Sequence, residues 1–531
     1  MLTSLPAVVL GPRPGSRLQR IGGIARGQGH SLATASLRTS TPPNPGSSVG
    51  PVVQRWDASG RRVLLALLAL TVVAGCTGGS EDSGADQSPR PTTVSSGIGA
   101  SGSPPAGTAG LTGSRTCQRG FTCATLTVPL DRAVPGGRTL PLRVVMETDR
   151  TAPRGVLLAL TGGPGQGGVS FASTVTKRVG PDVMRAYRLV MLDQRGTGNT
   201  VLRCPALQQA MGFSDLTPPP AGAVVACAQQ LGPARRFYST EDVVGDLDQL
   251  REALGAARLT VFGVSYGTFV AEHYSLAHPR QTRALVLDSV VPHVGIDPLA
   301  VDLMQASRRV LRDACRVVAC PGDPVADLGD VIKQYDDGVD LLDLITAMSI
   351  VDPTFSPLFP ALRSAREGNP GQLDQLVANY QSGMKGPADA LSQGLHASAL
   401  CADMTFPWGD SDAPLAGRTA ALTTAEERLS PADLLPFDRA TAVGNGLVQQ
   451  CLPWPPVPPA GLPTGGDLPD VPVLLLAGTH DLSTPMEWAR AEAALAPNGR
   501  LVEFPGLGHS VISQGRRGQV VLRDFLLGPA T

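Results

Sequence analysis

The stretch LTVFGVSYGTFVAEHYSLA, residues 259–277, decides the fold. An apolar run (Leu259–Phe262) leads into the pentapeptide Gly263-Val264-Ser265-Tyr266-Gly267, and a helical pattern follows. A G-x-S-x-G turn between a strand and a helix is so tight that its flanking positions must be small, and it lifts the serine hydroxyl above the sheet. The N-terminus of the helix behind it stabilises negative charge. We therefore predict that Ser265 is a nucleophile, with a Gly-rich structural turn as the alternative.

Apolar, β-branched runs recur on both sides of this stretch and alternate with helical patterns. Several are almost wholly apolar, which is typical of strands buried on both faces of a mostly parallel sheet. The order predicts an α/β protein with a doubly wound, mostly parallel, eight-stranded sheet. The eight runs are Ala124–Pro129, Leu140–Met146, Gly155–Leu160, Arg188–Leu192, Leu259–Phe262, Ala284–Leu287, Val471–Leu476 and Leu501–Phe504.

The strand pattern disappears between about residues 293 and 470, where helical runs are joined by Pro-rich connections. We interpret this segment as a helical cap inserted before the last two strands. A chain of 531 residues is long for one domain, which fits a core with such an insertion. The expected organisation is an N-terminal extension with a signal peptide (1–75), a linker (76–116), the first part of the core (117–292), the cap (293–470) and the C-terminal part of the core (471–531).

A serine nucleophile needs a general base, and after such a turn the acid and then the histidine follow along the chain. Among seven histidines only His480 and His509 come late enough. His509 lies in a Gly-rich loop after the final predicted strand, whereas His480 directly precedes the favoured acid, Asp481. We predict His509 as the base and Asp481 as the acid that orients it. Asp288, at the end of another strand, is the alternative acid and would otherwise bind loop amides.

The oxyanion hole of such a site needs two backbone N–H donors. One is expected from Tyr266, directly after the nucleophile. The other is expected from the loop TGGPGQGG, residues 161–168, which follows the third predicted strand. Proline has no N–H, so Gly163 is the predicted donor and Gly165 the next choice. We expect Asp193 and Arg195 to pair and brace this loop.

The region upstream of the core resembles an export signal. Arg61 and Arg62 precede the apolar run Val63–Val73, and small residues lead to Cys76. A charged region, a short apolar region and small residues are typical of a secretory signal, and the cysteine resembles the lipobox of bacterial lipoproteins. We expect a lipid on Cys76 and a membrane-anchored, outward-facing or released protein; a plain signal peptide or a short membrane helix is the alternative. Because a signal belongs at an N-terminus, we expect translation to start at Val52 or Val53.

The cysteine count fits an exported protein. Eight cysteines remain besides Cys76, and an even number in an exported chain suggests disulfides. No spacing is C-x-x-C, which argues against zinc or redox chemistry. Neighbour pairing is the simplest scheme, other connectivities stay open, and free buried thiols are the alternative. The candidate pairs are Cys117 with Cys123, Cys204 with Cys227, Cys315 with Cys320, and Cys401 with Cys451.

The composition indicates which classes of binding partner to expect. The net charge is −1 with no basic stripe, so nucleic acid is not an expected partner. No motif suggests a metal or an organic cofactor. We expect a monomer that acts on a peptide or a small ester.

The chain contains four short motifs, GGPG (162–165), DQRGTG (193–198), GVSYGT (263–268) and DLSTP (481–485). Together they resemble the tripeptidyl aminopeptidase group, which is related to proline iminopeptidases within the α/β hydrolases. The resemblance runs from about Cys117 to the C-terminus and implies the α/β-hydrolase fold. It also implies an exported actinobacterial serine peptidase that cuts short peptides from free N-termini. The sequence departs from related iminopeptidases at Thr161, where they carry histidine.

Three functions are compatible with these residues. The first is an aminopeptidase that releases di- or tripeptides, and the second is a carboxylesterase or lipase with the same triad. A carboxylate near the site would favour peptides, whereas an all-apolar tunnel would favour acyl chains. Asp403 and Glu272 are candidate partners for a substrate ammonium, although we expect both to be structural. The third is a non-catalytic envelope lipoprotein, against which the complete triad and oxyanion loop argue.

Overall fold

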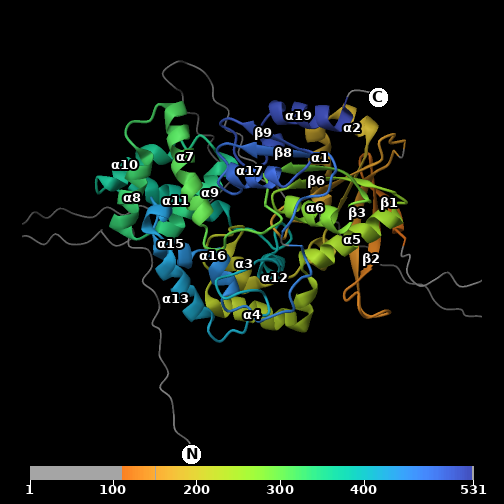
Figure 1. The fold of residues 1–531 in the computed structure, drawn as a ribbon, viewed down its shortest axis with the longest axis horizontal. Coiled ribbons are helices and arrows are strands. Elements are labelled where there is room, and N and C mark those ends of the chain that lie inside the picture. Colours follow the sequence, from red (N-terminus) through yellow and green to blue (C-terminus); the bar gives the residue numbers. More distant parts are fainter. Residues whose placement is uncertain (1–109, 150, 464, 529–531) are drawn as a thin grey trace, which may run out of the picture. The chain divides into compact units, whose positions relative to one another are not determined.

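The computed structural model describes residues 110–149, 151–463 and 465–528. The predicted signal peptide, Cys76 and most of the predicted linker lie outside these residues. Figure 1 shows the core sheet, with the helical segment that interrupts the core beside it. None of the helices in the described ranges is both long and apolar enough to cross a bilayer.

A nine-stranded sheet forms the core, with the strand order β1-β2-β3-β5-β4-β6-β7-β8-β9. The β1–β2, β2–β3 and β3–β5 pairs are antiparallel, and the five other pairs are parallel. The strands are β1 (Thr112–Gln118), β2 (Phe121–Pro129), β3 (Thr139–Glu147), β4 (Val156–Leu160), β5 (Arg188–Leu192), β6 (Leu259–Val264), β7 (Thr282–Asp288), β8 (Val473–Gly478) and β9 (Gly499–Phe504).

The eight predicted strands are all present, and β1 is the additional one. Six of its seven residues are exposed, and its sequence TGSRTCQ has no apolar alternation, so no periodicity marked it as a strand. Because β1 begins at Thr112, the predicted linker 76–116 must end before that residue. The strand pairs with β2 at the edge of the sheet, where main-chain hydrogen bonds suffice without a buried face.

Helices cover both faces of the sheet, as expected for a doubly wound protein. One face shares a buried cluster with α1 (Ala172–Val179), α2 (Pro181–Ala186), α18 (Val511–Gln514) and α19 (Arg516–Leu527). The other packs with α5 (Thr240–Ala253), α6 (Tyr266–Ala277) and α17 (Met486–Ala494). The strand ends that meet between these layers position the candidate site.

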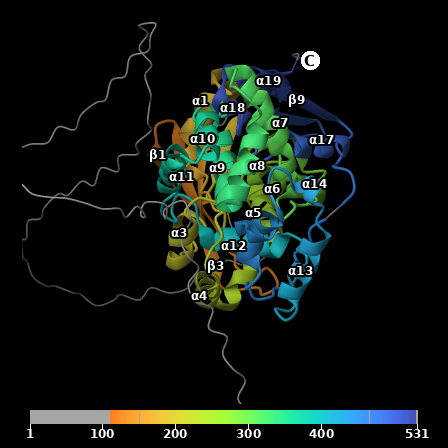
Figure 2. The same cartoon turned by 90° about the vertical axis from the view of Figure 1, so that its left-hand side faces the viewer.

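A helical segment lies between β7 and β8, as the sequence pattern predicts. In its described residues (289–463 and 465–472) every named element is a helix, and Figure 2 shows helices α7 to α11 facing the viewer. These helices are α7 (Val301–Val318), α8 (Pro324–Tyr335), α9 (Gly338–Val351), α10 (Leu358–Arg366), α11 (Gly371–Gly383), α12 (Gln393–Asp403), α13 (Arg418–Arg428), α14 (Pro431–Leu434), α15 (Arg439–Gly444) and α16 (Gly446–Cys451).

A second insertion, which sequence analysis did not single out, lies between β5 and α5. It carries α3 (Pro205–Met211) and α4 (Ala221–Leu231), which pack against α12 and α16. This insertion and the helical segment together form what we call the cap.

Four disulfides join the eight candidate cysteines, each to its neighbour along the chain. The Cys204–Cys227 bond ties the start of α3 to α4, and the Cys401–Cys451 bond ties α12 to α16, so these two lie within the cap. The others are Cys117–Cys123 and Cys315–Cys320.

Candidate active site

Ser265 lies in the tight turn between β6 and α6. Its backbone has φ 57° and ψ −132°, a left-handed conformation that is strained for a residue with a side chain. The Ser265 amide donates to the Asp288 carbonyl oxygen over 3.0 Å, which ties the turn to β7. A Cβ at Gly263 would lie 2.3 Å from the Gly267 carbonyl oxygen, so this position requires glycine. The turn therefore holds the serine hydroxyl at the N-terminus of α6.

His509 and Asp481 come together beside this turn, from the ends of two neighbouring strands. His509 Nδ1 lies 2.9 Å from Asp481 Oδ2. Asp481 follows β8 and is fully buried, whereas His509 follows β9 and lines the same cavity as Ser265. The structure thus brings the three predicted triad residues to one edge of the sheet.

The pKa values of His509 and Asp481 are each shifted in the direction that favours the charged form of the side chain. Burial alone would lower the pKa of His509, but the negative charge and hydrogen bond of Asp481 outweigh it and raise that pKa. Burial alone would raise the pKa of Asp481, but His509 and the hydrogen bonds from Thr484 hold it below its usual value. Asp481 is therefore an ionised partner that can orient the imidazole and stabilise its protonated form.

Thr484 belongs to the site, although sequence analysis gave it no role. Its hydroxyl donates to Asp481 Oδ2 over 2.8 Å and lies 3.3 Å from His509 Nδ1. The amides of Ser483 and Thr484 each donate to Asp481 Oδ1 over 2.9 Å. The only signal in the sequence was its place in the DLSTP motif.

The alternative acid Asp288 and the alternative base His480 make other contacts. Asp288, the alternative acid, accepts the amides of Val511 (2.8 Å) and Ile512 (3.1 Å), which directly follow the His509 loop. Its burial raises its pKa to about 6. This is the amide-binding role expected if Asp481 were the acid. His480 Nδ1 lies 2.7 Å from the Pro353 carbonyl oxygen and so contacts the cap.

The Gly-rich loop after β4 lies directly against the nucleophile. A Cβ at Gly162 would lie 2.8 Å from Ser265 Cβ and 3.1 Å from its Oγ, so only glycine allows this approach. Gly163 and Tyr266, the predicted donors, line a cavity with Ser265. Thr161 donates from its hydroxyl to the Gln166 carbonyl oxygen over 2.9 Å and so closes the loop.

The expected pairing of Asp193 with Arg195 is wrong. Arg195 is fully buried and makes two parallel 2.7 Å hydrogen bonds to Asp246 on α5. Asp193 instead accepts the Val169 amide over 2.9 Å and so braces the end of the glycine loop. The chain turns immediately after β5, where the Thr197 amide bonds to the Gln194 carbonyl, and the two side chains diverge.

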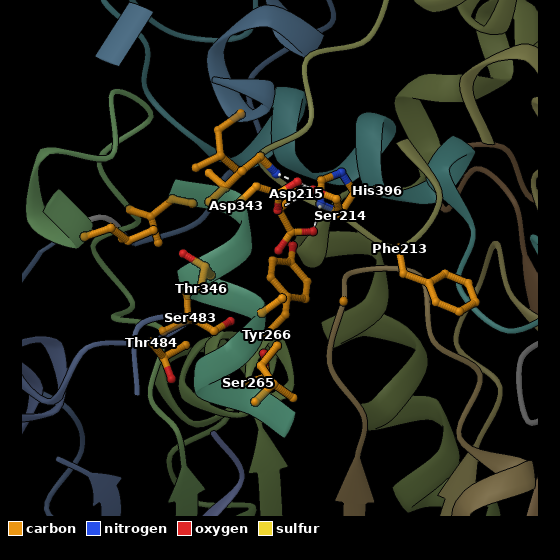
Figure 3. Close-up of a pocket in the computed structure, with 18 of the residues that line it drawn as sticks. Phe213, Ser214, Asp215, Ser265, Tyr266, Asp343, Thr346, His396, Ser483 and Thr484 are labelled. Atoms are coloured by element: carbon orange, nitrogen blue, oxygen red, sulfur yellow. Dashed lines mark hydrogen bonds and ion pairs between the residues drawn. The ribbon is translucent and has the colours of Figure 1, made fainter. Parts of the chain in front are cut away.

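Two acidic side chains from the cap line the cavity above Ser265 and Tyr266 (Figure 3). Asp215 comes from the connection between α3 and α4, and Asp343 from α9. Asp215 Oδ1 lies 2.8 Å from Nε2 of the buried His396, and its side chain is 43% exposed. Asp215 thus has the His396 imidazole on one side and is open on the other.

Asp343 is buried deeper in the same cavity. Its oxygens accept hydrogen bonds from Ser214 (2.8 Å), Thr217 (2.7 Å) and Tyr380 (2.9 Å). Burial nevertheless raises its pKa to about 6. No motif marks either acid, so sequence analysis missed both.

The remaining wall of this cavity is largely apolar. A second cavity of about 480 Å³, within the range of small-molecule sites, is lined by Ser265, Gly163 and His509 and shares Ser265, Gly163 and Asp215 with the first. The arrangement therefore offers a nucleophile and base on the floor, with apolar and acidic groups above them. The apolar residues include Val291, Leu303, Leu400, Met404, Leu447 and Trp488.

The two acids considered from the sequence do not line this cavity. Asp403 accepts the Thr240 amide (3.0 Å) and the Tyr266 hydroxyl (2.9 Å), so it holds the residue after the nucleophile. Glu272 is buried on α6, away from the cavity walls. Neither acid is therefore placed to bind a substrate ammonium in this cavity.

Comparison with known proteins is consistent with this architecture. Residues 155–310 match a family model described as the alpha/beta hydrolase fold, and residues 437–530 match one described as TAP-like protein. Serine protease Hip1 of Mycobacterium tuberculosis is 26% identical over 452 residues, which are 75% of this chain and 83% of that protein.

Two further relatives have names that state different activities. Tripeptidyl aminopeptidase of Streptomyces lividans is 31% identical over 188 residues, 32% of this chain and 35% of that protein. Carboxylesterase B of Mycobacterium tuberculosis is 26% identical over 456 residues, 76% of this chain and 84% of that protein.

Proposed function

Because the chain is a serine hydrolase of the α/β-hydrolase fold, in the group of the tripeptidyl aminopeptidases, we propose that it releases di- or tripeptides from free peptide N-termini. The observation that carries this proposal is the position of Asp215 and Asp343 in one cavity with Ser265. A free ammonium loses hydration when it enters such a cavity and needs a carboxylate in return. An acyl chain needs no such partner.

The chemistry is acyl transfer. Ser265 Oγ attacks the scissile carbonyl carbon while His509 Nε2 takes its proton and Asp481 holds the imidazole through Nδ1. The amides of Tyr266 and Gly163 donate to the oxyanion. His509 then returns the proton to the leaving amine as the C–N bond breaks, and a water deprotonated by His509 hydrolyses the acyl-serine.

The two acids play different parts in substrate binding. Asp215 is partly exposed and lies beside the His396 imidazole, so we assign it the contact with the ammonium. The oxygens of Asp343 already accept hydrogen bonds from three hydroxyls. Asp343 therefore adds negative charge near the ammonium without contacting it. The apolar wall takes the peptide side chains.

Turnover of three substrate types by the full chain tests the proposal. A chromogenic tripeptide with a free amine should be cut well, and its N-acetylated form poorly. A short-acyl ester reports on the triad without needing an ammonium contact. If acetylation of the tripeptide does not change kcat/KM, the aminopeptidase proposal fails.

An esterase is the second candidate. The apolar wall and the likeness to a protein named Carboxylesterase B favour it. In that case only the esters would turn over, and the acids above Ser265 would be dispensable.

We also propose that the protein is exported and carries a lipid on Cys76. The four disulfides support export, because structural disulfides persist in oxidising compartments. A labelled fatty acid fed to the host should enter the wild-type chain and not the Cys76→Ser variant. Equal labelling of both chains, or of neither, would contradict the lipid anchor.

A further inference from the structure

A buried cluster of acids and imidazoles lies outside the cavity that contains Ser265. Glu272 comes from α6, His293 from the segment after β7, and Glu492 from α17. All three are at most 1% exposed. One ligand atom of each, a carboxylate oxygen or a ring nitrogen, lies within 4.8 Å of the others.

The polar atoms of this cluster are only partly satisfied. His293 Nδ1 lies 2.7 Å from Glu492 Oε1, and the His293 amide donates to Oε2 over 3.3 Å. Neither carboxylate oxygen of Glu272, nor His293 Nε2, has a hydrogen-bond partner among the described residues. Native proteins rarely bury such atoms without a partner, because a charged or polar group that leaves water destabilises the fold unless it gains a new partner.

We propose that Glu272, His293 and Glu492 bind one divalent transition-metal ion, Zn²⁺ or Mn²⁺. Two carboxylates and an imidazole form a donor set that suits these ions. The charges of two ionised glutamates and one divalent cation cancel, so the burial that disfavours the glutamates alone would favour the complex. The neighbouring His273, buried with both ring nitrogens unpartnered among the described residues, adds a further polar group beside the cluster.

The ion would join three elements that support the active site. Helix α6 begins at the predicted oxyanion donor Tyr266, and α17 begins two residues after Thr484. The third element follows β7, whose last residue is Asp288. None of the three ligands lines the described cavities that contain Ser265, so the ion's role is structural and independent of the proposed peptide specificity.

Metal content of the full chain tests this inference. The cluster is buried, so the ion should bind as the chain folds. The protein is therefore produced in medium supplemented with Zn²⁺ or with Mn²⁺, purified without chelators, and analysed by elemental mass spectrometry. We expect about one ion of one of these metals per chain, and a Tm several degrees above that of protein refolded with EDTA.

Substitutions of the two proposed glutamate ligands test where the ion binds. Glu272→Gln and Glu492→Gln should each lose the bound metal and the metal-dependent rise in Tm. Glu487→Gln is the matched control, because Glu487 lies on the same helix but is exposed and paired with Arg309. This variant should keep both properties.

Two results would overturn the inference. One is wild-type protein with far less than one equivalent of either metal and a Tm that does not depend on them. The other is a folded Glu272→Gln variant that keeps a full equivalent. If neither Gln variant folds, the wild-type metal content and Tm decide the question alone.

Discussion

The core and the cap contribute different parts of the site. Ser265, Asp481 and His509 lie at the ends of three core strands, where the backbone of the sheet fixes their positions. Asp215 and Asp343 come from the two insertions that form the cap. In the mechanism proposed above, the core breaks the bond and the cap selects the substrate. Core substitutions should therefore affect all substrates alike, whereas cap substitutions should affect only some.

The largest effect is expected for Ser265→Ala. Loss of the nucleophile should lower kcat by roughly 10⁴- to 10⁶-fold for peptides and esters alike, since only binding and the oxyanion donors remain. Steady-state kinetics with both substrate types measures it. A variant that still cuts one substrate type well would contradict a shared catalytic centre.

The second-largest effect on kcat is expected for only one of the two buried acids of the core. Asp481→Asn should lower kcat by about 10⁴-fold, because the amide cannot hold the imidazole in the required tautomer. Asp288→Asn should mainly lower Tm, because Asp288 binds the amides of Val511 and Ile512. Comparing kcat and Tm of the two variants distinguishes the roles. The reverse pattern would make Asp288 the catalytic acid.

A smaller effect is expected at the glycine loop. Gly162→Ala places a methyl group against Ser265 Cβ and displaces the loop that carries Gly163. Loss of one oxyanion donor costs roughly 10²- to 10³-fold in kcat, and peptides and esters should lose equally. An unchanged kcat would show that the loop does not supply a donor.

The pH dependence should differ between substrate types. His509 must be neutral to accept a proton and its pKa is raised, so kcat/KM should rise with pH through a midpoint above 6.5 for every substrate. Asp343, with a pKa of about 6, is neutral below that value. KM for free-amine peptides should therefore increase further below pH 6, while KM for esters should not. Parallel profiles would leave Asp343 without a role in ammonium binding.

The same carboxyl also links pH to stability. The folded-state pKa of Asp343 is about 6, above the ordinary value of 3.8, because burial favours the protonated carboxyl. Its contribution to the free energy of unfolding is therefore fully present below pH 3.8 and is lost as the pH rises through about 6. Asp343→Asn should remove this part of the pH dependence of Tm between pH 4 and 7. An unchanged slope of Tm against pH would contradict the assignment.

The parts of the molecule that could be predicted from the sequence are those with a local pattern. The turn at Ser265 and the loop at His509 each join a strand to a short motif, and the buried strands are apolar runs. In contrast, β1 is an exposed edge strand whose polar residues carry no pattern.

Long-range packing explains what was missed. Arg195 pairs with Asp246, 51 residues away, rather than with its near neighbour Asp193. Asp343 lies 129 residues from Ser214, which donates to it, and α3, α4 and α9 bring the two together. Nothing in the local sequence of Asp215 or Asp343 marks a binding site, because the cavity exists only once both insertions fold over the core.

The most direct test of the central claim is the ratio of kcat/KM for a free-amine tripeptide to that for its N-acetylated form, measured on the full chain and on Asp215→Asn. Asp389→Asn is the matched control, an exposed acid paired with the exposed Arg203. We predict a high ratio for wild type and the control, and a ratio lower by roughly 10- to 100-fold for Asp215→Asn, with ester turnover preserved. A ratio near one for wild type, or one that Asp215→Asn leaves unchanged, would contradict the assignment of substrate choice to the acids of the cap.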